Sequence, residues 1–210
     1  MEEKAINEKE SLELISQMIK TTKTNLGKGS GNALLIWGYS CLIASAVVMV
    51  MAYILHVQHA GWAYFLIPIL GISATLVLKR MNRDTTEGQA ITYIAKSLEA
   101  MYGSCSFVFT AYIAIAFYHY DNHVVWKGAF FLGCFIPAFC TMATGTLMRI
   151  KNINVLGIIG IVLSLVLLAN FMIGDGVNIV GVVFGIVSWI CSLIIPGHIL
   201  NHEAKKQMKK

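Results

Sequence analysis

Histidine and aspartate side chains recur in two of the short polar stretches that separate the apolar segments of this chain. His56 and His59 are separated by two residues, and His119, Asp121 and His123 alternate in YHYDNHVVW. Neutral imidazole is a good ligand for zinc, copper and nickel. These five residues are therefore a candidate metal site. The alternative interpretation is that they are solvated polar residues at a membrane surface, where an amphipathic imidazole is well tolerated.

A second pair, His198 and His202, is spaced by four residues and would share one face of a helix. No carboxylate or cysteine at a suitable spacing completes a metal site there, and a protonated histidine stabilises the C-terminal end of a helix. We interpret this pair as helix-capping residues. The five cysteines are odd in number and fall in apolar segments, which predicts packing residues rather than disulfides or a zinc site: Cys41, Cys105, Cys134, Cys140 and Cys191.

Motifs of the common enzyme classes are missing from the sequence. It contains no P-loop, no Gly-x-Ser-x-Gly motif, no His-Glu-x-x-His motif and no carboxylate pair inside an apolar segment. We therefore expect a non-enzymatic protein with no catalytic residues and no cofactor. The net charge of +5 does not predict a nucleic-acid-binding surface, because membrane topology accounts for the placement of the basic residues.

The elements that would position these side chains are six long apolar segments. Apolar residues make up 57% of the 210-residue chain and charged residues only 13%. A helix of about 20 apolar residues crosses a hydrocarbon core of roughly 30 Å. The sequence therefore predicts an all-α polytopic membrane protein with spans at about 33–55, 62–78, 100–118, 128–148, 153–173 and 178–200, none of which contains a charged residue, and with a basic tail at 201–210.

Basic residues fall almost entirely in alternate polar segments. Of the 16 lysines and arginines, all except Lys127 precede the first span, separate the second from the third, separate the fourth from the fifth, or follow the sixth. Because segments rich in lysine and arginine stay in the cytoplasm, both termini are predicted to be cytoplasmic. The six spans would then form three hairpins in the inner membrane.

Two polar segments on the predicted cytoplasmic side carry apolar residues at helical spacing. Residues 1–32 are predicted to hold an amphipathic helix over about 8–25, followed by a glycine-rich linker in which Ser30 or Asn32 caps the first span. The segment before the third span continues into that span as one helix. Either the two apolar faces bury each other, or they form a docking surface for a cytoplasmic partner, with candidate residues Leu12, Ile15, Ile19, Ile91, Ile94 and Leu98.

Small residues and prolines mark several places within the spans. Gly181 and Gly185 form a GxxxG pattern, which predicts close helix packing either within the chain or in a homodimer. Pro68 and Pro137 are expected to kink their spans near the middle of the membrane, and Asn170 is a polar side chain at membrane depth; together they could line a cavity. Aromatic residues near the span ends are expected to form an interfacial belt: Trp37, Trp62, Tyr64, Trp126 and Trp189.

The opening of the chain carries the most distinctive sequence. The segment ESLELISQMIKTTKTNLGKGSGN at 10–32, followed by LLIWGY at 34–39, resembles the opening of a group of uncharacterised small multi-span proteins of gut-type bacteria. The resemblance covers about thirty residues. It implies a bacterial inner-membrane protein and transfers no catalytic or binding residue.

We therefore expect an integral membrane protein with a binding, sensing or adaptor role, whose cytoplasmic helices dock a partner. Its expected partners are the lipid bilayer, a cytoplasmic protein and, through the GxxxG pattern, a second copy of the chain. The alternative function is a small transporter or channel subunit for a metal ion or an uncharged solute. That alternative predicts a continuous polar cavity between Pro68 and Pro137.

Overall fold

The computed structural model describes residues 31–56, 60–81, 93–119, 123–173 and 179–208. These residues contain helices and no strand, which confirms the all-α class. In chain order the elements are α2 (Asn32–Met49) with the π-helical η1 (Val50–Ile54), the 3₁₀-helical η2 (Ala60–Phe65) with α3 (Leu66–Met81), α5 (Tyr93–Tyr118), α6 (His123–Leu147), α7 (Lys151–Ile173), and α8 (Ile179–Trp189) with the π-helical η3 (Ile190–Ile194) and α9 (Ile195–Met208).

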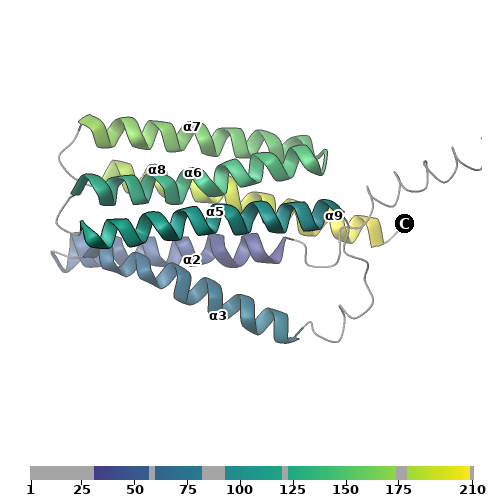
Figure 1. The fold of residues 1–210 in the computed structure, drawn as a ribbon, viewed down its shortest axis with the longest axis horizontal. Coiled ribbons are helices and arrows are strands. Elements are labelled where there is room, and N and C mark those ends of the chain that lie inside the picture. The colour runs from purple at the N-terminus through teal and green to yellow at the C-terminus, as the bar shows by residue number, and fades with distance from the viewer. Residues whose placement is uncertain (1–30, 57–59, 82–92, 120–122, 174–178, 209–210) are drawn as a thin grey trace, which may run out of the picture.

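Six helical segments are long and apolar enough to cross a membrane, as the sequence predicts. They are Asn32–Ile54, Ala60–Leu78, Lys96–Tyr118, Val124–Leu147, Lys151–Ile173 and Ile179–Lys206. Their long axes run roughly side by side, so that they form one bundle (Figure 1). The sixth segment continues as a helix through Met208, and most of the predicted basic tail is therefore the helical end of α9.

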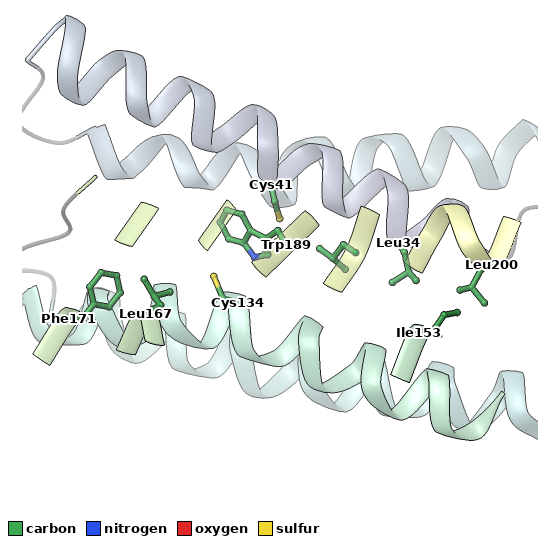
Figure 2. Packing of buried hydrophobic residues seen from close by; sticks show 9 residues of the cluster. Leu34, Cys41, Cys134, Ile153, Leu167, Phe171, Trp189 and Leu200 are labelled. Atoms are coloured by element: carbon green, nitrogen blue, oxygen red, sulfur yellow. The ribbon is translucent and has the colours of Figure 1, made fainter. Parts of the chain in front are cut away.

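The core of the bundle lies between the first helix and the last four. Helix α2 packs on α8, η3 and α9, while α6 and α7 pack on each other and on α8 and η3. Figure 2 shows Cys41 of α2 and Cys134 of α6 pointing into this core beside Trp189, with Ile153 near Leu200 at one end. The buried side chains described here are mostly apolar, seven are serine or threonine and none is charged, so close packing and hydrogen bonds rather than charge hold the bundle together.

Helices α6 and α7 are joined by a turn of only three residues. Helix α6 ends in a Schellman motif: the Ile150 amide donates to Gly145 O at 2.9 Å and the Arg149 amide donates to Thr146 O at 3.2 Å. Arg149 has a φ of 55°, and Gly145 and Gly157 let the two backbones touch. Small residues at such a contact allow the close helix packing that stabilises membrane bundles.

Helices α3 and α5 lie at the edge of the bundle. Helix α3 packs mainly on α2, and α5 packs mainly on α6. Only 6% of the residues in the apolar windows of these two spans are buried, against 44% in the last span. Near one end, the rings of Trp62, Phe65, Phe117 and Trp126 lie 5.3–6.3 Å apart between centroids and link η2 to α5 and α6.

The beginning of α2 differs from the expected cap. Gly31 is the N-cap residue, and no side chain caps the helix. Instead, Asn201 of α9 accepts a hydrogen bond from the Gly31 amide at 3.0 Å and donates one to Asn32 Oδ1 at 2.7 Å. A Cβ atom on Gly31 would overlap the backbone of Gly197, so the two helices meet at a pair of glycines. This junction replaces a local cap with a contact between the first and last spans.

Candidate functional site

The polar interior of the bundle is organised around the prolines of spans four and six. Pro137 lies inside α6, where it cannot donate a hydrogen bond to the carbonyl of Gly133 four residues earlier. Trp189, which is 2% exposed, donates its indole N–H to that carbonyl at 2.9 Å. The carbonyl freed by a proline in α6 is thus satisfied by a side chain at the end of α8.

The same arrangement occurs in the opposite direction. Pro196, near the start of α9, leaves the carbonyl of Ser192 without its usual backbone donor. The hydroxyl of Thr141, which is fully buried in α6, donates to Ser192 O. Spans four and six therefore exchange donors: each supplies the side chain that satisfies the carbonyl freed by the other's proline. A carbonyl left unsatisfied at this depth would be costly, because no water reaches it.

Three buried serines extend this polar interior to span five. Ser164 of α7 donates to Gly160 O at 2.8 Å, and its hydroxyl lies 3.3 Å from that of Ser188. Ser188 also donates to Gly160 O at 3.2 Å, while Ser192 donates to Ser188 O at 2.7 Å. Each hydroxyl therefore has a partner within the bundle. Chemically, the arrangement is suited to holding helices together, because these hydroxyls bond to backbone carbonyls and to each other.

The candidate metal ligands are dispersed or fall outside the described residues. His56 is exposed, with a φ of 50°, at the end of η1, and His119 is exposed just after α5, with its ring against that of Tyr118. His123 begins α6, while His59 and Asp121 lie outside the described residues. Within the described ranges, no three residues of the types His, Cys, Asp and Glu come close enough to hold a metal ion.

The His198 and His202 pair lies on exposed positions of α9. His198 Nε2 lies 3.1 Å from the hydroxyl of Tyr39 in α2, with the two rings nearly perpendicular. This contact adds a second polar link between the first and last helices, three residues before Asn201 along α9 and about two turns after Asn32 along α2. Because α9 continues to Met208, His198 lies in the first turn of this helix, and the expected role at a helix C-terminus is wrong for it; its contact is with another helix.

Two of the predicted cavity residues, Pro68 and Asn170, take no part in the hydrogen bonds that link spans four, five and six. Pro68 is exposed in the first turn of α3, close to the point where the 3₁₀ segment gives way to the α-helix. Asn170 lies in α7, and its amide oxygen is buried without a hydrogen-bond partner. Beside it, the ammonium group of Lys127 donates to the carbonyl of Phe171 at 3.2 Å and stabilises the C-terminal end of α7.

The predicted helix-packing residues face the interior of this chain. A Cβ atom on Gly185 would lie 2.7 Å from the ring of Phe130 in α6, and Gly181 is buried. The GxxxG pattern therefore packs α8 within the bundle. Of the docking residues, Leu98 is buried at 8% exposure and Ile94 belongs to α5, while Leu12, Ile15, Ile19 and Ile91 lie outside the described residues.

The expectation that all the tryptophans form an interfacial belt is wrong for Trp189. Its ring is packed between those of Tyr64 and Phe130 in the core, with centroids 6.1 and 5.6 Å away, because its indole N–H satisfies a carbonyl there. Tyr64 also belongs to the core and not to the belt. The sequence does contain a signal for such a contact, because each proline within a helix identifies the carbonyl four residues earlier as one that needs another donor.

Comparison of the chain with protein-family models, with curated proteins and with solved structures returns no match.

Proposed function

We propose that this chain is a non-enzymatic adaptor of the inner membrane, with both termini in the cytoplasm, that binds a partner protein through its cytoplasmic helices. The observation that carries this proposal is the exchange of donors between spans four and six. It satisfies the carbonyls freed by Pro137 and Pro196 inside the bundle, so these groups are not left to coordinate a solute. Carbonyls that are satisfied from within the bundle favour a role at its periphery.

Helix α5 supports the same proposal. It begins at Tyr93, ahead of its membrane span, so the segment that precedes the membrane is continuous with a transmembrane helix. Leu98 fixes that early part of α5 to the bundle, and its burial removes it from the docking surface. The partner-facing residues of the proposal are therefore Leu12, Ile15, Ile19, Ile91 and Ile94.

Crosslinking in native membranes tests the adaptor function. A light-activated crosslinking amino acid at Ile15 is expected to form one discrete adduct with a second protein. That adduct should disappear when Leu12→Asp is added on the same helix face and persist when Gln17→Asp adds the same charge on the opposite face. Adducts formed only with this chain itself would mean that the two amphipathic segments bury each other, and would refute the adaptor.

A small transporter or channel subunit for a metal ion or an uncharged solute is the second candidate. The observation that favours it is the irregular sixth span, where the π-helical η3 ends two residues before Pro196. Such interruptions occur at functional sites in membrane helices. Flux of zinc or glycerol into vesicles that contain the purified protein would support this candidate if it exceeds flux into protein-free vesicles; equal flux would refute it for these solutes.

A further inference from the structure

Arg149 occupies a backbone conformation that favours glycine. With a φ of 55°, it is the left-handed residue of the Schellman motif that ends α6. Glycine is the usual residue at this position, because a Cβ atom disfavours the left-handed region. The chain thus retains a long cationic side chain where glycine would fold more readily. A disfavoured residue of this kind points to a role for its side chain.

The turn that contains Arg149 lies where the apolar part of the bundle ends. Helix α6 carries no charged residue from Gly128 to Leu147, which is 43% exposed, and α7 carries none after Lys151. Arg149 and Lys151 between them are both exposed. In a membrane, this level corresponds to the headgroup layer that borders the hydrocarbon core.

The surrounding surface is strongly basic. The α6–α7 turn lies at the same end of the bundle as the end of α3, the start of α5 and the end of α9 (Figure 1). Exposed basic side chains are found at each of these helix ends: Arg80, Lys96, Lys205 and Lys206. Among the described residues the only acidic ones are Glu99 and Glu203. This end therefore attracts anions, and the bundle itself provides few groups that neutralise it.

We propose that Arg149 and Lys151 of the α6–α7 turn bind the phosphate group of an anionic phospholipid. A guanidinium group pairs with phosphate through two parallel hydrogen bonds, and an ammonium group adds a second charge. The lipid is favoured over a soluble phosphate compound because the turn lies at the headgroup level, where anionic lipids are concentrated next to basic residues. Exposed Leu147 adjoins the turn and lies where the acyl chain of such a lipid would lie.

Lipid retention by the full-length protein tests this site. The protein is placed in nanodiscs of one part phosphatidylglycerol to nine parts phosphatidylcholine, and the lipids that stay bound on release are measured by native mass spectrometry. The wild type is expected to retain phosphatidylglycerol in excess over its share. The double variant Arg149→Gly, Lys151→Gln should lower that enrichment by at least about fivefold, the effect of one lost basic residue near an anionic surface.

A matched control separates a defined site from diffuse attraction. Lys205→Gln with Lys206→Gln removes the same charge from the same end of the bundle and should lower the enrichment clearly less, because these lysines contribute only diffuse attraction. An equal loss in both double variants, or no loss in the first, overturns the site. Loss of the enrichment on adding millimolar inorganic phosphate or glycerol phosphate overturns the assignment to a lipid.

The single variant Arg149→Gly distinguishes binding from folding. In phosphatidylcholine alone its melting temperature should equal or exceed that of the wild type, because glycine suits the left-handed position. In the mixed lipid it should lose the stabilisation that phosphatidylglycerol gives to the wild type. If the glycine variant melts lower in phosphatidylcholine, Arg149 is a structural residue and the proposal fails; Arg149→Gln, which keeps the Cβ atom and lacks the charge, repeats the binding measurement independently.

Discussion

The indole nitrogen of Trp189 lies 2.9 Å from the carbonyl oxygen of Gly133, and the two residues belong to different spans. That carbonyl is the one whose backbone donor is missing because residue 137 is proline. A tryptophan that would ordinarily lie at the membrane surface is therefore held in the core by a single acceptor. The stabilising contribution of the Trp189 hydrogen bond can therefore be measured by comparing variants of Trp189 with and without the proline at position 137.

Replacing Trp189 with phenylalanine should destabilise the bundle by about 1–3 kcal/mol, because Gly133 O loses its donor in a water-free interior. The free energy of unfolding in mixed micelles, measured by titration with a denaturing detergent, checks this. Trp62→Phe is the matched control: Trp62 is 51% exposed, and its replacement should have a much smaller effect.

A double-mutant cycle tests the cause. Pro137→Ala restores a backbone N–H that can donate to Gly133 O, so Trp189→Phe should be clearly less destabilising in that background. Equal effects in both backgrounds would show that Trp189 acts only through its volume.

Thr141→Val should destabilise the bundle by about 1 kcal/mol, a typical value for a hydrogen bond between membrane helices. Valine keeps the shape of the side chain and removes the donor to Ser192 O. Thr110→Val is the control, because the Thr110 hydroxyl donates to a carbonyl of its own helix on an exposed face. Thermal unfolding of the two variants in one detergent compares them directly; a larger loss for Thr110→Val would contradict the interhelical role of Thr141.

Gly157→Ala should destabilise the protein by about 1–3 kcal/mol, because a Cβ atom there would overlap the backbone of Met142 in α6. Gly103→Ala is the same change at a position with nothing within 4 Å of the added atom. It should be neutral or slightly stabilising, because alanine favours a helix more than glycine does. Similar melting temperatures for the two variants would mean that α6 and α7 do not touch at Gly157.

The metal site at His56, His59, His119, Asp121 and His123 remains a prediction of the sequence. If they bind a metal, micromolar zinc should raise the melting temperature of the protein in detergent, and His59→Ala with His123→Ala should abolish that rise. His198→Ala with His202→Ala, which removes two histidines from α9, should leave the rise intact. An unchanged response in the first pair of variants excludes these residues as ligands.

The spans could be predicted from the sequence because the cost of placing backbone in hydrocarbon leaves few alternatives to a long apolar helix. All six apolar segments appear as helices, with bounds within a few residues of the predicted ones, apart from the longer sixth helix. The proline at position 137 also identifies, from the sequence alone, the Gly133 carbonyl as one that needs another donor. Hydropathy alone therefore accounts for the number of helices.

Which face of each helix lies inside could not be predicted in the same way. In a soluble protein the polar face of a helix identifies its exposed side, whereas here both sides of most spans are apolar. Trp62 and Trp189 illustrate the problem: they are the same residue type, yet one is half exposed and the other is buried. Whether each of these side chains is buried depends on its contacts with another span, and the sequence around the tryptophan does not contain that information.

The contact between Gly31 and Asn201 joins residues that are 170 positions apart. At a synthesis rate of about 5–20 residues per second, the first span waits roughly 10–35 s for its counterpart to emerge from the ribosome. During that interval the glycine and asparagine at the start of α2, and the face that later covers α8 and α9, have only lipid and the insertion machinery beside them. Helix α2 can pack on α3 as soon as that helix is made, but its packing is completed only when the last span has been inserted.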